Sequence, residues 1–276
     1  MAQQQQDFNE TIGRIKRDTP IATPPLPIIG NIRIGEKRQP QGGGKEYPVS
    51  LDYFKPTGDF AKLFTDAYGA KPNKIQVIFI SNDNVQSCHE EYDARDAAGR
   101  RAGYGDGETF YLYDLKKEEY IKYEPNKIPA DKEFMTKYTK DNKLVWKVVL
   151  TLHFIIPKIK GVFGVWRFQT RGSKSSIQQI ISAFDMIKNS AGTIVNIPFD
   201  MVVEKVKSQK PENKSVFPVV KLIPNITQDN LDIVRGFLQH GGNVMQIGML
   251  TDEKIKEIPK QTLLLTENKD QKNEQH

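Results

Sequence analysis

The chain has 276 residues, of which 38% are hydrophobic and 27% are charged, and its formal net charge is +6. The composition excludes a chain that is disordered throughout, and the longest apolar run lies in residues 148–156, is broken by Thr151 and His153, and is too short to span a membrane. The N-terminus has no secretory signal and the only cysteine, Cys88, can form no internal disulfide, so we expect a cytoplasmic protein without membrane contact.

Both ends of the chain are polar. Residues 1–27 combine a glutamine run, a basic patch and a proline-rich segment, which predicts a flexible N-terminal arm. The sequence from about residue 267 is wholly polar and is expected to be disordered. Between these ends we expect an N-terminal α+β subdomain over 28–144, a second subdomain over 145–240, and a C-terminal extension over 241–276.

The first subdomain is expected to mix short strands with one helix. Apolar residues recur at helical spacing over residues 59–68, and Gly69 supplies a stop for that helix. Residues 81–107 are a polar stretch that is expected to end in a glycine-rich turn. The other elements expected here are strands over 32–34, 76–80 and 110–113 and a loop over 41–44.

The second subdomain has the clearest periodicity. From Val145 to Ile156 every even position is apolar, which predicts a long strand with one buried face. A helix is expected over 175–190, with Ser173 at its N-cap and Gly192 at its end. The order β-β-α-β-β-α predicts an α+β fold, an antiparallel sheet with helices packed on one face. The remaining elements are strands over 162–170, 197–207 and 215–222 and a helix over 228–239 that Thr227 can cap.

Positive charge is concentrated in one segment. Residues 145–224 hold twelve Lys or Arg against four Asp or Glu. Such an excess can attract DNA phosphates or an acidic protein, or it can simply keep strand edges soluble. Trp166 and Phe168 alternate with Arg167 and are expected in the core. If the turns converge, one surface for DNA or a partner would contain Arg33, Lys158, Lys160, Arg167, Arg171, Lys174, Lys205 and Lys207.

No complete catalytic or metal-ligand set can be assembled from the sequence. His89-Glu90-Glu91 could donate a metal ligand, but no second His or Cys lies nearby, and a solvated loop is the simpler interpretation. Cys88 and His89 are adjacent and would point to opposite faces of an extended chain, so they do not suit a nucleophile and its base. We therefore expect no catalytic residues, no cofactor and no bound metal.

The glycine-rich segment Gly103–Gly107 lacks the spacing of a phosphate loop. Glycines around Asp106 favour a tight turn in which the carboxylate accepts hydrogen bonds from its own backbone. A ligand or metal contact of Asp106 is the alternative interpretation.

A set of short motifs follows in a recognisable order along the chain. In this order they resemble a family of phage and integrative-element proteins over roughly residues 28–225. Some members are described as recombination directionality factors for large serine integrases, and others as hydrolase or metal-binding proteins. The motifs are Gly30-Asn-Ile-Arg33-Ile-Gly35, Glu46-Tyr-Pro48, Asp52-Tyr-Phe54, Tyr68-Gly69-Ala-Lys-Pro72, Gly105-Asp-Gly107, Val165-Trp166-Arg167-Phe168-Gln169-Thr170, a Ser-Ser-Ile helix start and Ile197-Pro198-Phe199.

The resemblance implies an accessory factor of DNA recombination that binds a serine integrase on DNA and favours excision. Its partners would be DNA, the DNA-bound integrase or both, and it could form a homo-oligomer. Metal-bearing relatives carry several cysteines after the Gly-Asp-Gly turn, whereas residues 115–144 have none, so we predict no bound zinc.

Two other functions remain open at this point. A single-stranded DNA-binding or annealing protein of a phage or mobile element could use a basic sheet of the ββαββα block to hold a strand by its backbone. A hydrolase would need a clustered acid pair around Asp106 and Glu108.

Overall fold

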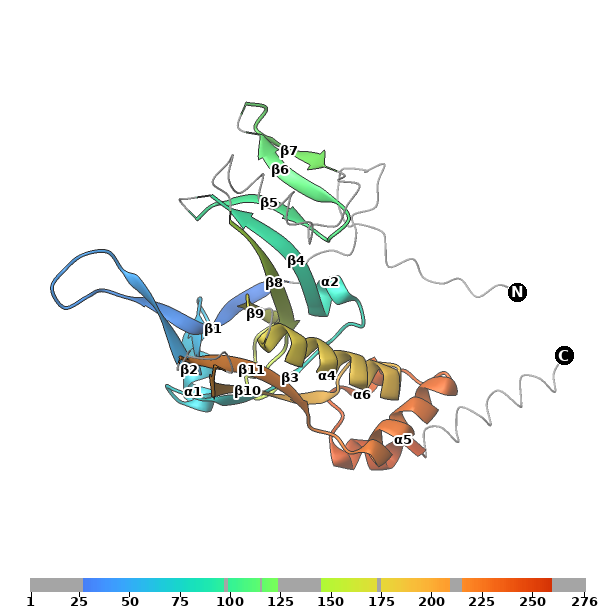
Figure 1. Cartoon of the computed structure of the whole chain (residues 1–276). Coiled ribbons are helices and arrows are strands. Elements are labelled where there is room, and N and C mark those ends of the chain that lie inside the picture. Colours follow the sequence, from blue (N-terminus) through green and yellow to red (C-terminus); the bar gives the residue numbers. More distant parts are fainter. Residues whose placement is uncertain are drawn as a thin grey trace.

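The computed structural model of the chain describes residues 27–96, 99–114, 116–123, 145–172, 175–208 and 215–259 (Figure 1). These residues form an α+β structure with two sheets, which confirms the predicted fold class. The arm over 1–26 and the C-terminal end from residue 260 lie outside the described residues.

The larger sheet has eight strands in the order β2-β1-β9-β8-β4-β5-β6-β7. Neighbouring strands are antiparallel except β1 and β9, which run parallel with Ile32 beside Phe168. The strands are β1 (Ile28–Arg38), β2 (Tyr47–Thr57), β4 (Cys88–Arg95), β5 (Arg101–Gly105), β6 (Phe110–Asp114), β7 (Glu119–Tyr123), β8 (Val145–Phe154) and β9 (Val165–Thr170).

The smaller sheet is antiparallel and has three strands in the order β11-β10-β3. Segments 28–144 and 145–240 both contribute strands to each sheet, because β3 (Lys74–Ile78) pairs with β10 (Pro198–Lys207) and β4 pairs with β8. Strand pairing thus joins the two segments within each sheet. The division into two subdomains stays a prediction. The remaining labelled elements are β11 (Val216–Pro224), α1 (Ala61–Tyr68), α2 (Asn84–Ser87), α4 (Ser176–Ala191), α5 (Gln228–Gln239) and α6 (Val244–Ile247), and residues 252–259 are also helical.

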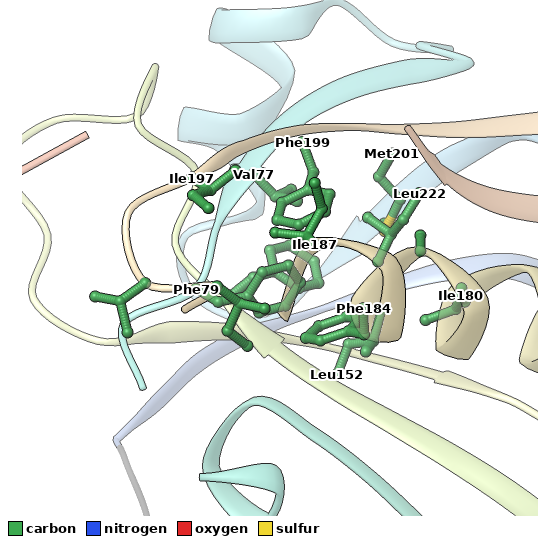
Figure 2. Packing of buried hydrophobic residues seen from close by; sticks show 14 of the residues in the cluster. Val77, Phe79, Leu152, Ile180, Phe184, Ile187, Ile197, Phe199, Met201 and Leu222 are labelled. Atoms are coloured by element: carbon green, nitrogen blue, oxygen red, sulfur yellow. The ribbon is translucent and has the colours of Figure 1, made fainter. Parts of the chain in front are cut away.

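The main core gathers around Phe79, where both sheets and α4 meet (Figure 2). The Phe79 ring centroid lies 4.6 Å from that of Phe184 in α4, 5.5 Å from that of Phe199 in β10 and 6.4 Å from that of Phe154 in β8. All three pairs meet edge to face, an arrangement that stabilises aromatic pairs beyond the burial of their area. This packing fixes the large sheet with one face against the core.

The periodicity predicted for β8 is confirmed. Leu150, Leu152 and Phe154 are buried on the core face of the strand. Thr151, which faces the other way, is buried as well, because the Gln169 side-chain amide covers it and donates a hydrogen bond to its Oγ1 at 3.0 Å.

Two helices begin and end close to the predicted residues. The Thr227 hydroxyl caps α5 by accepting a hydrogen bond from the Asn230 N–H at 3.3 Å. Gly192 ends α4 in the left-handed conformation that glycine adopts without strain. Ser173 lies outside the described residues, and Ser175 occupies the N-cap position of α4, where its hydroxyl donates to the Gly172 carbonyl oxygen at 3.5 Å and forms no capping hydrogen bond.

The solvated loop predicted at His89-Glu90-Glu91 is wrong, because these residues lie in β4, and the polar stretch 81–107 also contains α2 and β5. Strands β2 and β7 are likewise absent from the prediction. Strand β4 carries His89, Glu91, Asp93 and Arg95 at alternate positions, and the sheet face that these side chains share is polar. The charged side chains at these positions therefore lie on the polar face of a strand and not in a loop. None of the helices in the described ranges is long and apolar enough to cross a membrane.

Candidate functional site

The face of the large sheet that points away from the main core collects polar side chains from neighbouring strands. On β9, Arg167 and Gln169 lie opposite His153 and Thr151 of β8. On β4, His89, Glu91 and Asp93 lie opposite Thr151, Val149 and Lys147 of β8. Residues that face each other in an antiparallel pair share one side of the sheet, so these side chains form one surface.

A cleft of about 570 Å³ lies on this surface, and we call it the arginine cleft. Its lining includes Glu91 and Asp93, together with Ser50 of β2 and Phe217 and Pro218 of β11. Five guanidinium groups from β1, β4, β5 and the end of β9 line it: Arg33, Arg95, Arg101, Arg167 and Arg171. Their convergence places a strong positive potential in a concave site.

Asp93 organises three of these arginines. Its Oδ2 lies 2.8 Å from Arg95 Nε and 3.0 Å from Arg171 Nη2, and its Oδ1 lies 3.5 Å from Arg101 Nε. The side chain is only 4% exposed, and Oδ1 accepts no hydrogen bond within the described part of the chain. A buried carboxylate held by three partly exposed guanidinium groups fixes their positions in the cleft.

Glu91 supplies a second negative charge beside the cleft. Its Oε2 lies 2.7 Å from Arg101 Nη2 and 3.6 Å from His89 Nε2. Burial acts to raise the pKa of Glu91, but the hydrogen bond with His89 and the charge of Arg101 outweigh it and leave the pKa below its ordinary value. Glu91 is therefore a carboxylate at neutral pH.

Arg33 and Arg167 differ from the other three arginines, since neither forms an ion pair with another described residue. Arg33 is exposed, and Arg167 is held by a hydrogen bond from its Nε to Asn31 Oδ1 at 2.8 Å. His153 adds no charge beside Arg167, because burial and that guanidinium both lower its pKa. These two guanidinium groups carry the cleft's least compensated positive charge.

The other predicted site residues that the structure describes do not line the arginine cleft. Lys158 lines another cleft, where its Nζ lies 4.7 Å from the centroid of the Tyr68 ring. Lys160 is exposed in the same loop. Lys205 Nζ pairs with Asp52 Oδ2 at 2.7 Å, and Lys207 is exposed two residues further along β10. Lys174 lies outside the described residues.

Arg33, Arg167 and Arg171 are thus the predicted site residues that the structure brings together. The sequence-based prediction does not include Arg95, Arg101, Glu91 or Asp93, because apart from Arg33 it takes its residues from the basic segment 145–224. Charged residues alternate with Tyr92 and Ala94 from Glu91 to Arg95, and this period of two is the signal that could have found a polar strand face.

The predicted turn at Asp106 is confirmed. Its Oδ1 accepts hydrogen bonds from the Glu108 N–H at 2.9 Å and the Thr109 N–H at 2.8 Å, and these bonds lower its pKa. Asp106 and Glu108 both line a smaller cleft of about 340 Å³ with Glu90. The Asp106 carboxylate in this cleft is already occupied by the hydrogen bonds of its own turn.

Cys88 packs against the main core, and burial, with smaller contributions from Glu90 and Asp185, raises the pKa of its thiol to about 12. His89 lies on the opposite face of β4, as alternation requires. Within the described ranges, no three His, Cys, Asp or Glu residues are grouped so that they could hold a metal ion. The predictions of no bound zinc and no catalytic residue stay predictions.

Comparison with known proteins gives one match. Residues 29–225 match the model of a family named Gp3-like and described as recombination directionality factor-like. No curated protein and no solved structure matches the chain.

Proposed function

The chain belongs to the recombination directionality factor-like family, and we propose that it binds a serine integrase on DNA and favours the excision-competent arrangement. Membership supports an accessory role in phage DNA recombination, and the finer assignment is our inference from that role and from the arginine cleft.

The observation that carries the proposal is the convergence of five guanidinium groups in the arginine cleft. Guanidinium groups bind phosphate and carboxylate oxygens through paired N–H donors, and they keep their charge when partly buried. Two carboxylates hold three of the arginines in place, which leaves Arg33 and Arg167 as the principal contacts for a DNA phosphate. We propose that five lysines outside the cleft attract DNA phosphates, without the fixed positions that the cleft arginines have. They are Lys158, Lys160, Lys174, Lys205 and Lys207.

The proposed mechanism needs no bond-making chemistry by this chain. An accessory protein that contacts one arrangement of integrase and DNA more tightly than another shifts the population toward it. The shift is limited by the difference in affinity, so a hundredfold preference changes the ratio of the two arrangements by at most a hundredfold. Contacts of the arginine cleft that can form in only one arrangement would supply that difference.

The test compares two double variants. Arg33→Gln with Arg167→Gln removes the two cleft charges that form no ion pair with a described carboxylate, and Lys158→Gln with Lys160→Gln removes two exposed charges elsewhere. Binding to duplex carrying the recombination site is measured with and without the bound serine integrase, and excision products are counted in a reconstituted reaction. We expect the arginine pair to weaken binding to the integrase–DNA complex by about tenfold and to lower excision.

The lysine pair should change both quantities by less than the arginine pair. The proposal fails if the arginine variant binds the integrase–DNA complex and supports excision as the unsubstituted protein does. Thermal unfolding of both variants controls for loss of structure.

A further inference from the structure

The polar face of the large sheet continues beyond the arginine cleft as a group of four tyrosines. Strands β5, β6 and β7 extend from β4 away from α4, at the top of Figure 1. On these strands Tyr104 lies opposite Tyr111, and Tyr113 lies opposite Tyr120. Tyr104 also lies opposite Asp93 on β4, so the tyrosines and the arginine cleft occupy the same side of the sheet. We call Tyr104, Tyr111, Tyr113 and Tyr120 the tyrosine platform.

The four rings contact one another across the strands. Tyr104 and Tyr111 are stacked with centroids 4.8 Å apart, and Tyr120 meets Tyr104 at 5.3 Å and Tyr113 at 5.1 Å, both edge to face. Tyr113 is 39% exposed and Tyr120 is 40% exposed. Large aromatic side chains that stay accessible as a group mark a contact surface more often than a folding requirement.

The opposite side of the same strands has its own small core. Ala94, Phe110 and Trp146 are buried there, and Tyr92, Ala102 and Leu112 pack against them. This cluster already gives β5 and β6 an apolar face to bury, as strands of a two-sided sheet need. The tyrosine platform is therefore a second aromatic surface with open ring area.

Arg101 joins the tyrosine platform to the arginine cleft. A β-bulge shifts the register between Ala94 and Arg95, so that Arg101 lies opposite Arg95. The Arg101 guanidinium lies 4.6 Å from the centroid of the Tyr104 ring, while its Nη2 pairs with Glu91. Bulges commonly re-aim a side chain at a functional surface. Here the bulge places one guanidinium between the rings and the other four arginines.

We propose that the tyrosine platform stacks unpaired bases of single-stranded DNA whose phosphates lie in the arginine cleft. Proteins that hold single strands combine a cationic track for the backbone with aromatic rings for the bases. Bases inside a duplex are stacked on each other and offer no free face to a sheet, so the tyrosine platform selects unpaired bases. This activity goes beyond the proposed function, because it requires no integrase.

The test separates base contacts from phosphate contacts. Fluorescence anisotropy measures binding of the full chain to an oligothymidylate of about twelve nucleotides and to an abasic oligonucleotide with the same number of phosphates. We expect the oligothymidylate to bind about tenfold more tightly, which corresponds to the stacking of one to two bases. Equal affinity for the two oligonucleotides, or no binding of the oligothymidylate, would overturn the proposal.

Two variants locate the effect. Tyr113→Ser with Tyr120→Ser should abolish the preference for bases, whereas Tyr113→Phe with Tyr120→Phe keeps the rings and should preserve it. If the serine variant keeps the preference, the rings do not bind bases and the proposal is wrong. If the serine variant does not fold, the comparison of the two oligonucleotides on the unsubstituted protein still decides.

The same variants distinguish this proposal from the proposed function. Binding to the integrase–DNA duplex should not change in the tyrosine variants and should fall with Arg33→Gln and Arg167→Gln. A platform that binds a protein segment instead of bases would show the opposite result, with the tyrosine variants weakening binding only when integrase is present.

Discussion

The two faces of the eight-stranded sheet differ in what they contact, although the same strands supply both. On β9, Trp166 and Phe168 are buried in the main core, and Arg167 between them points to the arginine cleft. On β4, Cys88 packs against the core while His89 and Glu91 form a contact on the polar face. Stability should therefore depend on one set of alternate residues and recognition on the other, except that Asp93 on the polar face should contribute to both.

The largest effect on stability is expected on the core face. Phe154→Ala removes a buried ring that contacts Phe79, and we expect it to lower the free energy of unfolding by about 3–5 kcal/mol. Phe163→Ala is the matched control, because Phe163 is 92% exposed and its loss should change that free energy by about 0.5 kcal/mol or less. Denaturant titration measures both, and similar costs would contradict the division between faces.

The next effect concerns the reactivity of the Cys88 thiol on β4. Since burial raises the pKa of the Cys88 thiol to about 12 from 9.0, its thiolate fraction at pH 8 should be about a thousandfold below that of an unfolded chain. Alkylation by iodoacetamide should be correspondingly slow in the native protein. It should accelerate about tenfold per pH unit, because the thiolate is the reactive form.

Alkylation in denaturant provides the reference rate for Cys88. Native and unfolded protein reacting at the same rate at pH 8 would show that Cys88 does not face the core. That result would also reopen a chemical role for Cys88 beside His89.

Asp93→Asn should have a smaller effect on stability than Phe154→Ala, although Asp93 lies on the polar face. It removes a buried charge that holds Arg95, Arg101 and Arg171, and we expect it to lower the free energy of unfolding by about 2 kcal/mol. Added salt should reduce the loss, because it screens the repulsion among the arginines left behind.

Asp66→Asn is the matched control for Asp93→Asn. Asp66 pairs with Lys62 on an exposed surface of α1, where such a pair contributes about 0.5 kcal/mol or less. Equal costs for the two substitutions would mean that Asp93 does not organise the cleft.

Much of the core face could be predicted from local pattern. Period two across β8 and helical spacing across α4 and α5 each lie within one segment, and the structure confirms these elements. The polar face depends on partners far apart in the sequence. Asp93 binds Arg171 across 78 positions, and no local pattern shows that pair. The alternation of charged residues in β4 can indicate a polar strand face, but it does not show which arginines that face brings to Asp93.

The same limit applies to the predicted binding residues. A count of positive charges over 145–224 includes Arg167 and Lys205 on equal terms. The structure separates them, because Lys205 is paired with Asp52 of β2 and Arg167 has no acidic partner within the described ranges. Net charge in a segment cannot show which cations are neutralised by residues elsewhere in the chain.

The salt dependence of binding to the integrase–DNA complex tests the central claim most directly. Each phosphate contact contributes about 0.9 to the slope of log Kobs against log salt concentration. Arg33→Gln with Arg167→Gln should therefore make the slope shallower by about 2, and Lys158→Gln with Lys160→Gln should change it less. An arginine variant with the affinity and slope of the unsubstituted protein, beside a lysine variant with reduced values, would place the binding surface outside the arginine cleft.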